Sequence, residues 1–390
     1  MSLPTRGMHR VERANSEDEL SGLQAAWTAL LTDVPAVPIF LTWEWVSTCW
    51  RHYGHGRELW LLIVKDETGR LAGLAPWMLM HHRLGPLRLR RIRFIGSGLV
   101  CPCHLDVIAR PGEKAAVCAA LLSYLYANRR EWDVVDLEGV AENCVLESHF
   151  ARLDGRCRVT KDLVCPLISL PDSWEAYHKS LKKKLRRNLR YFDSLLEREH
   201  PDQAFFHRVT EADELSSAMD SLVTMHQKRW HGKGQVTCFD NSRYVRFHCE
   251  IAALALERGW LRFYQLKVAD QAIAALYCFR HQDTFYAYQI GFDPDWSRYS
   301  PGRLLIAHVI QESIKEKARA FDWLRGEDEY KLAWASEESV DSYLLLGTGW
   351  KGHLWLFGVD VWRMAISIGR RTLPRAFQQR IERFFSARRQ

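Results

Sequence analysis

The sequence predicts a mixed α/β (α+β) protein of two similar units arranged in tandem. At 390 residues the chain is too long for one ordinary domain and fits two. Residues 58–80, ELWLLIVKDETGRLAGLAPWMLM, show two apolar runs around a polar turn and predict a β-hairpin. Residues 260–280, WLRFYQLKVADQAIAALYCFR, repeat that pattern about two hundred residues later. A duplicated unit is the economical interpretation, with chance similarity of two hairpins as the alternative.

The elements of the first half follow in a simple order. Residues 16–53 predict two helices, split by DVPAVP, and the hairpin comes next. LRRIRFI and HLDVIA predict further strands, and Pro111-Gly112 opens the helix EKAAVCAALLSYLYANR. The strand WDVVDLEG, which contains Asp136, completes a mostly antiparallel sheet flanked by helices.

The second half repeats this series after a basic segment. DSWEAYHKSLKKKLRRNLRYFDSLLEREH predicts a long helix or a helix pair, capped at Asp172 or Ser173. The helix YVRFHCEIAALALERG precedes the second hairpin, and FDWLRG, with Asp322, corresponds to VDLEG in the first half. We therefore expect domains at 1–168 and 169–350, followed by a basic amphipathic helical tail at 351–390.

The stretch 284–331 carries the strongest functional signal. The strand TFYAYQI leads through a polar loop into the helix RLLIAHVIQESIKEKA. Ser300 can cap that helix, Pro301 suits its first turn, and Gly302 allows a ligand to approach the backbone. Free amides and the positive end of the helix dipole then predict an anion site. A capped helix without a ligand is the alternative.

Composition narrows the class of protein. Nearly half of the residues are hydrophobic, no apolar run resembles a signal peptide or a membrane span, and the cysteines have no framework spacing. We expect reduced thiols, no bound metal and a cytoplasmic location. The net charge of +7 is concentrated in a block at 182–190 and in the tail, which suits phosphate ligands, RNA or an anionic membrane surface. A solvated helix face explains such blocks equally simply.

Several motifs together resemble a known superfamily. They are SLKKKLRRNLR, HQKRW, the second hairpin, GFDPDWSRYSPGRLL and FDWLRGEDEYKLAWA, with FLTWEWVSTCW, LAGLAPWML and HLDVIARPG in the first half. The chain resembles the GCN5-related N-acetyltransferases (GNAT), in the tandem branch with CelD/BioF-like acetyltransferases and Fem-type aminoacyl transferases. The resemblance spans most of residues 16–347.

The resemblance implies two tandem GNAT-like domains and an acyl-CoA co-substrate, without a metal. In GNAT enzymes the pyrophosphate lies on the loop before the central helix, which Trp296 to Arg303 would supply. The expected donor-binding residues are Arg298, Ser300, Pro301, Gly302 and Arg303. The usual Gln/Arg-x-x-Gly-x-Gly/Ala form is absent there, which puts acetyl-CoA itself in question. The chain also lacks the coiled-coil arm of many Fem-type members, which favours a thioester donor.

Acyl transfer to an amine needs a base, donors for the thioester oxygen and an acid for the leaving thiolate. The candidate catalytic residues are Asp322, Tyr330 and Tyr299. The candidate substrate-binding residues are Lys183, Arg187, Asn188, Arg190, His226, Trp230, Glu327 and Lys331. Each has a structural alternative: a turn cap for Asp322, packing for the tyrosines and the His226–Trp230 pair, and solvated surface for the charged groups.

We therefore expect an acyl-CoA-dependent N-acyltransferase acting on a small or carrier-linked amine. An amino-sugar, cell-envelope or exopolysaccharide precursor is the acceptor that the resemblance suggests. An aminoacyl-tRNA-dependent Fem-type transferase is the first alternative, and it would bind tRNA through the basic blocks. A non-catalytic tandem-GNAT scaffold at a membrane surface, contacted through the tail, is the second.

Overall fold

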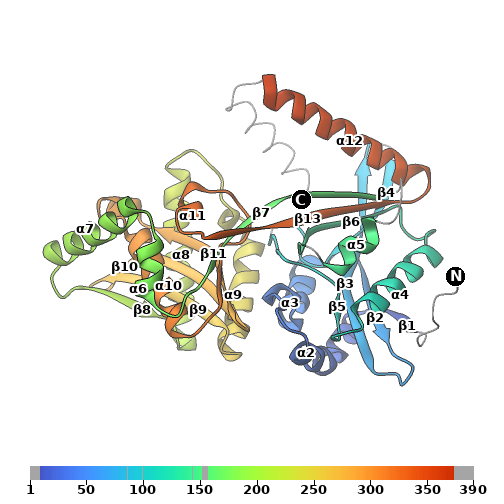
Figure 1. The fold of residues 1–390 in the computed structure, drawn as a ribbon, viewed down its shortest axis with the longest axis horizontal. Coiled ribbons are helices and arrows are strands. Elements are labelled where there is room, and N and C mark those ends of the chain that lie inside the picture. Colours follow the sequence, from blue (N-terminus) through green and yellow to red (C-terminus); the bar gives the residue numbers. More distant parts are fainter. Residues whose placement is uncertain (1–8, 86, 99, 143, 152–156, 373–390) are drawn as a thin grey trace. The chain divides into compact units, whose positions relative to one another are not determined.

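The chain forms two compact units, each a β-sheet covered by helices (Figure 1). The computed structural model describes residues 9–85, 87–98, 100–142, 144–151 and 157–372. Unit 1 consists of Met1–Pro35, Phe40–Asp162 and Asp341–Gln390, and unit 2 of Ala36–Ile39 and Leu163–Val340. The predicted mixed α/β class is confirmed.

The sheet of unit 1 has the strand order β1-β2-β3-β4-β6-β13. Its strands are β1 (Arg10–Ala14), β2 (Glu58–Lys65), β3 (Leu71–Leu84), β4 (Leu87–Phe94), β6 (Val134–Val140) and β13 (Glu337–Gly347), with the short β5 (Ile108–Ala109) beside β3. The helices are α1 (Glu17–Gly22), α2 (Gln24–Asp33), α3 (Trp43–Tyr53), α4 (Lys114–Ala127), α5 (Val145–Ala151) and α12 (Gly349–Thr372).

The sheet of unit 2 has the order β8-β9-β10-β11-β12-β7. Its strands are β7 (Cys157–Ser169), β8 (Ala204–Arg208), β9 (Leu261–Val268), β10 (Gln271–His281), β11 (Thr284–Phe292) and β12 (Ala320–Asp322). The helices are α6 (Trp174–Ser180), α7 (Lys183–Glu199), α8 (Ala212–His231), α9 (Ser242–Glu257), α10 (Pro301–Lys315) and α11 (Glu329–Leu332), with the 3-10 turns η2 (Cys238–Asp240) and η3 (Pro294–Tyr299).

The two sheets share one topology, so the duplication inferred from the hairpins is confirmed. The hairpin β2–β3 occupies the second and third positions of its sheet, as β9–β10 does in unit 2. In both sheets all neighbours are antiparallel except the fourth and fifth strands, β4–β6 and β11–β12, which are parallel. A parallel pair needs a crossover helix, which α4 and α10 supply.

The sixth strand of each sheet comes from a distant part of the chain. The chain passes into unit 2 within β7 and returns to unit 1 within β13, where Ser342–Gly347 pair with β6. Residues 341–350, predicted to belong to the second domain, therefore lie in unit 1. The tail predicted at 351–390 continues α12 as far as Thr372, and residues 373–390 lie outside the described part of the chain.

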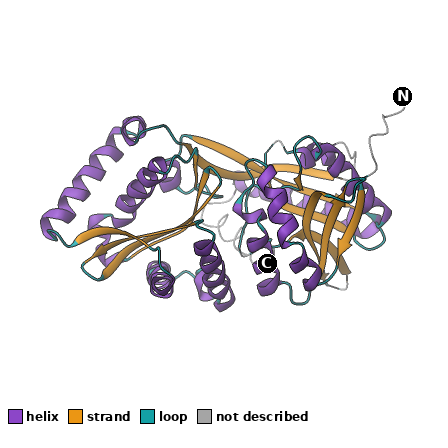
Figure 2. Ribbon diagram, turned by 90° about the horizontal axis from the view of Figure 1, so that it is seen from below, coloured by secondary structure: helices purple, strands orange, loops and turns teal. Residues whose placement is uncertain are grey.

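Helices cover both faces of the sheet in unit 2 (Figure 2). Alternate residues of β11 point to opposite faces. Ile290 and Phe292 face Gly302 of α10, whereas Gly291 faces Leu222 and Met225 of α8. The helix α10 therefore lies on one face of β11 and α8 on the other.

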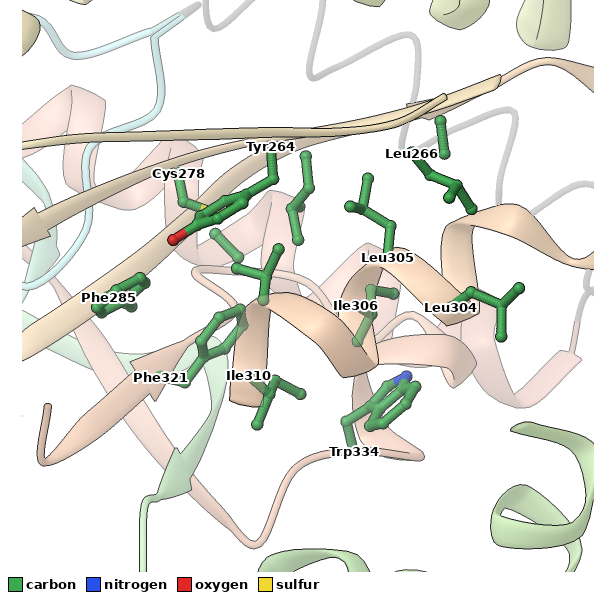
Figure 3. Packing of buried hydrophobic residues seen from close by; sticks show 14 of the residues in the cluster. Tyr264, Leu266, Cys278, Phe285, Leu304, Leu305, Ile306, Ile310, Phe321 and Trp334 are labelled. Carbon is green, nitrogen blue, oxygen red and sulfur yellow. The ribbon is translucent and has the colours of Figure 1, made fainter. Parts of the chain in front are cut away.

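The core of unit 2 is centred on α10 (Figure 3). Leu304, Leu305, Ile306 and Ile310 are at most 5% exposed and pack against strand residues such as Leu266. The segment predicted as a long helix or a helix pair forms the pair α6 and α7, and α7 adds a buried face to the same core. That face consists of Leu185, Leu189 and Leu196, with Phe192 partly buried.

Truncating the centre of this core should destabilise unit 2. Leu305 is fully buried, so Leu305→Ala should lower the free energy of unfolding by about 2–5 kcal/mol. Leu354→Ala is the matched control, because Leu354 is 51% exposed on another helix and should cost under about 1 kcal/mol. Urea denaturation followed by circular dichroism measures both. If the two variants lost equal amounts of unfolding free energy, α10 would not be the centre of the core.

Candidate functional site

The first part of the candidate site is the turn between β11 and α10. Ser300 adopts a left-handed conformation (φ 51°), which lets the chain leave η3 and enter α10. Pro301 occupies the first turn as predicted, but the Ser300 side chain makes no capping hydrogen bond. The predicted cap is therefore wrong, because the left-handed backbone does not place the hydroxyl over the first amides. Asp293 provides a side-chain cap one turn earlier, where it accepts from the Asp295 amide at 3.0 Å.

Gly302 of α10 faces β11, but its packing there does not require a glycine. A Cβ at this position would lie 3.5 Å from the Phe292 ring and 3.8 Å from Ile290, in ordinary van der Waals contact. A side chain at position 302 would thus face β11. The Arg303 amide donates to the Ser300 carbonyl, while the first amides of any helix lack an intrahelical acceptor. Donor contact at this turn, which remains a prediction, would have to use the Gly302 amide.

Arg298 and Tyr299 are both attached to α7. The Arg298 guanidinium lies 2.6 Å from a carboxylate oxygen of Glu199, and the Tyr299 hydroxyl donates to the other oxygen at 2.8 Å. This hydrogen bond raises the pKa of Tyr299. Arg298 is thus neutralised within the protein, whereas Arg303 is exposed and has no carboxylate partner among the described residues. Of the two predicted donor arginines, Arg303 is the one with an uncompensated charge.

Arg229 is a cation at this turn that the sequence did not single out. Its guanidinium lies 4.7 Å from the centre of the Phe292 ring and 5.7 Å from that of Trp230. The neighbouring Lys228 instead binds Asp293 and Asp295 at 2.6 Å each. Within the described ranges, Arg229 has no carboxylate partner. Basic residues in a last helical turn are common for dipole reasons, so nothing in the motif HQKRW distinguished Arg229.

Tyr330 lies close to this cation. Its ring meets that of Trp323 edge-on at 6.0 Å, and burial, the largest influence, raises its pKa, with nearby Arg229 opposing the shift. The phenol therefore remains protonated at neutral pH and can donate a proton or a hydrogen bond. Its predicted role as an acid remains a prediction.

Lys331 and Glu327 are placed differently. Lys331 is buried, and its Nζ donates to the Arg325 carbonyl at 2.7 Å and lies 3.8 Å from Asp328. The amine thus holds the 325–328 turn in place and is not directed to solvent. Glu327 is exposed on that turn. The structure therefore favours a structural role for Lys331 and leaves Glu327 on the surface.

Asp322 ends β12, opposite Tyr286 of β11. It is 6% exposed, and its Oδ1 accepts from the Leu324 amide at 2.7 Å, where Leu324 has a positive φ of 54°. The carboxylate also contributes to raising the pKa of Tyr286, after burial. Asp322 therefore caps the turn, the alternative named above, and its use as a base or orienting group remains a prediction.

His226 and Trp230 form a buried pair on α8. The Trp230 indole donates to Nε2 of His226 at 3.2 Å, and Nδ1 lies 2.7 Å from the Thr237 hydroxyl. Burial lowers the pKa of His226 to about 4, with a smaller contribution from Arg229 and an opposing one from Asp240. The ring is therefore neutral, with its proton on Nδ1, because Nε2 accepts. Packing accounts for the pair, as the structural alternative proposed.

The second part of the candidate site is a basic pocket on α7. A pocket of about 420 Å³ is lined by Lys183, Arg186, Arg187 and Arg190, which are spaced on one helical face. No carboxylate among the described residues pairs with them, and the buried Nε of Arg186 has no hydrogen-bond partner there. Three of the predicted substrate-binding residues, Lys183, Arg187 and Arg190, line this pocket together with Arg186, and their binding role stays a prediction. Asn188, half-buried on α7, does not line the pocket.

The start of α7 concentrates positive potential at this pocket. Its first turn contains no acidic residue, and Lys182 at the N-cap makes no side-chain cap. Cations at a helix N-terminus oppose the helix dipole, so an anion bound here would relieve that repulsion. Arg190 precedes Glu199 by nine residues, about 13 Å along the axis. The basic pocket is therefore separate from the Glu199-bound turn before α10.

The position in unit 1 that corresponds to Asp322 is occupied by Asp136, which is enclosed by ion pairs. Asp136 on β6 is fully buried and pairs with Arg91 and Arg93 of β4, and Arg93 also contacts Glu138 at 3.2 Å. In unit 2 the strand partner of Asp322 is Tyr286, not an arginine. The two units therefore share a topology but not the chemistry at this position.

Neutral His226 makes stability depend on pH. The pKa of His226 is about 4 in the folded protein, against an ordinary value of 6.5. Below pH 6.5 the unfolded chain therefore binds a proton at this histidine that the folded protein does not bind. The free energy of unfolding should fall by up to about 3 kcal/mol between pH 7 and 4, with no such contribution above pH 7. His226→Gln should flatten this dependence in urea titrations at each pH. The exposed His231→Gln is the control, and unchanged pH dependence in His226→Gln would contradict the assignment.

Comparison with known proteins identifies the fold. Residues 183–332 match a family described as an acetyltransferase (GNAT) domain. No curated protein matches the chain. The crystal structure of FemX superposes with a TM-score of 0.60 at 10% identity, over 86% of this chain and 96% of that one.

Two further solved structures give similar results. A conserved protein of unknown function from Bacteroides thetaiotaomicron superposes with a TM-score of 0.55 at 13% identity, over 86% of this chain and all (100%) of that one. L-PGS from Bacillus licheniformis gives 0.50 at 11% identity, over 86% and 94%. At these identities the likeness concerns the fold, which is the GNAT fold; the CelD/BioF-like branch remains a prediction.

Proposed function

We propose that the chain is a GNAT-type acyltransferase that moves an acyl group from a CoA thioester to an amine in the cytoplasm, with its reaction site in unit 2. The observation that carries the proposal is that residues 183–332, the segment matching an acetyltransferase domain, contain all of the uncompensated candidate groups. These groups are the basic residues of the α7 pocket, Arg229 in the last turn of α8, Arg303 at the start of α10, and the Tyr330 phenol. In unit 1, by contrast, Arg91 and Arg93 already pair with Asp136, the residue that corresponds to Asp322.

The start of α10 is the proposed donor site. The positive end of the helix dipole, Arg303 and Arg229 favour a pyrophosphate there. Arg298 contributes less than the sequence suggested, because Glu199 already neutralises it. Ser300 and Pro301 shape the turn, and Gly302 faces Phe292 and Ile290 of β11.

The transfer itself needs two proton movements. The amine attacks the thioester carbon, a C–N bond forms, the C–S bond breaks, the amine loses a proton and the thiolate gains one. Tyr330, whose pKa is raised by burial, suits the acid that protonates the thiolate. Asp322 is the proposed group that orients or deprotonates the amine, and Tyr299 is the second hydroxyl candidate. Direct transfer between two bound substrates requires no covalent enzyme intermediate.

The α7 pocket is the proposed site for an anionic part of the acceptor. Four cations on one face suit a phosphate, as in a nucleotide-linked or carrier-linked amino sugar. A cell-envelope or exopolysaccharide precursor has this chemistry. The same pocket also favours the second candidate function, aminoacyl transfer from tRNA, because a cationic groove binds the phosphate backbone.

Removing Arg229 should weaken donor binding without unfolding the protein. Each lost charge-assisted contact is worth roughly 1.5–3 kcal/mol, so Arg229→Ala should raise the Kd for acetyl-CoA about tenfold or more in calorimetry. Lys233→Ala is the matched control, because Lys233 also lies over the Trp230 ring but is exposed. Equal affinity in Arg229→Ala and the parent would place the donor elsewhere. If no CoA thioester binds the parent, the donor class is wrong.

The α7 pocket separates the two candidate functions. Arg187→Ala should weaken binding of inorganic pyrophosphate by about tenfold, whereas Lys184→Ala, on the same helix but outside the pocket, should not. If tRNA is the donor, bulk tRNA should bind with a steep salt dependence that Arg187→Ala reduces. Tight tRNA binding together with no response to CoA thioesters would replace the first function with the second.

A further inference from the structure

The helix α12 presents a continuous apolar stripe to solvent. Its large side chains recur at alternating intervals of four and three residues, which places them on one helical face. They are Trp350, Leu354, Phe357, Val361 and Met364, each between 49% and 68% exposed. These five make up half of the exposed large hydrophobic side chains in the described part of the chain. Such a patch is unusual on a surface that contacts only water.

The stripe is separate from the core of unit 1. The opposite face of α12 packs on the sheet, where Leu356 is buried with Val134 and Leu345. Gly352 on that side lies against the Asp133 carbonyl, where a Cβ would come within 2.3 Å. The helix is therefore anchored by one face, and the stripe is not needed to hold it in place.

The charge of this end of the chain is strongly one-sided. Residues 349–390 contain nine Lys or Arg and two Asp or Glu, a net charge of +7 that equals the net charge of the whole chain. The remainder of the protein is therefore balanced. One of the two acids, Asp360, is paired with Arg158 at 2.9 Å. An apolar stripe thus continues directly into a cationic segment.

We propose that α12 docks the protein on the surface of an anionic phospholipid bilayer. The stripe would insert among the acyl chains near the headgroups, and the cations of α12 would bind lipid phosphates. The charge pattern favours this occupant over a second copy, because pairing two copies would bring two segments of +7 together. The stripe also spans only about two heptads, short for a coiled coil. Among the described helices, none is long and apolar enough to cross the bilayer, so binding is at the surface.

Sedimentation with vesicles tests the proposal on the full-length protein. The parent should bind vesicles of phosphatidylglycerol and phosphatidylcholine, bind phosphatidylcholine vesicles weakly, and be released by salt. Phe357→Ser should lower the partition coefficient about tenfold, because one large apolar side chain no longer inserts. Phe205→Ser is the matched control, since Phe205 is 47% exposed on β8 and should leave partitioning unchanged. Arg370→Glu/Arg371→Glu should weaken binding to the anionic vesicles only.

Three outcomes would overturn the proposal. The first is that the parent protein fails to sediment with phosphatidylglycerol vesicles at low salt. The second is that Phe357→Ser binds these vesicles as tightly as the parent does. The third is that light scattering shows a concentration-dependent dimer that Phe357→Ser abolishes, in which case a second copy covers the stripe. Circular dichroism of each variant checks that the fold is retained, as expected for Phe357 and Phe205, which are exposed.

Discussion

The parallel pairing of β11 with β12 is the constraint on which the rest of unit 2 depends. Two parallel neighbours cannot be joined by a tight turn, so the chain must cross over one face of the sheet as α10. That crossover fills the core with leucine and isoleucine side chains (Figure 3). It also places the start of α10 beside the end of β11. The fold alone therefore places a helix N-terminus next to Phe292, whether or not a ligand binds there.

The same constraint operates in unit 1 with different residues. There β4 and β6 are parallel and α4 crosses over, but Arg91 and Arg93 surround the buried Asp136. Removing one partner of such a buried pair leaves an uncompensated charge, so losing either Arg91 or Asp136 would destabilise the sheet. In unit 2 Tyr286 is the strand neighbour of Asp322, and Arg229 of α8, which lies over Phe292 at the end of β11, has no carboxylate partner among the described residues. This asymmetry is the physical basis for placing the reaction in unit 2.

The sequence predicted those features that depend on local pattern. Two apolar runs around a polar turn predicted both hairpins, and the basic residues at 182–190 stood out as one block in a predicted helix. Features that depend on distant partners were not predictable. The chain passes between the units within β7 and within β13, and the sequence pattern does not show where these crossings occur. Arg229 became a candidate only when the Phe292 ring and the acids bound by Lys228 were located.

Hydrogen exchange with saturating acetyl-CoA tests the central claim most directly. The account predicts slower exchange of the Gly302 amide at the start of α10, because a bound pyrophosphate accepts from that amide, whereas the Arg303 and Leu304 amides already donate to the Ser300 carbonyl. The corresponding amides at the start of α4, from Lys114 onward, should exchange at the same rate with and without the ligand. Protection at α4 instead of α10, or no change at either helix under saturation, would contradict the assignment of the donor site to unit 2.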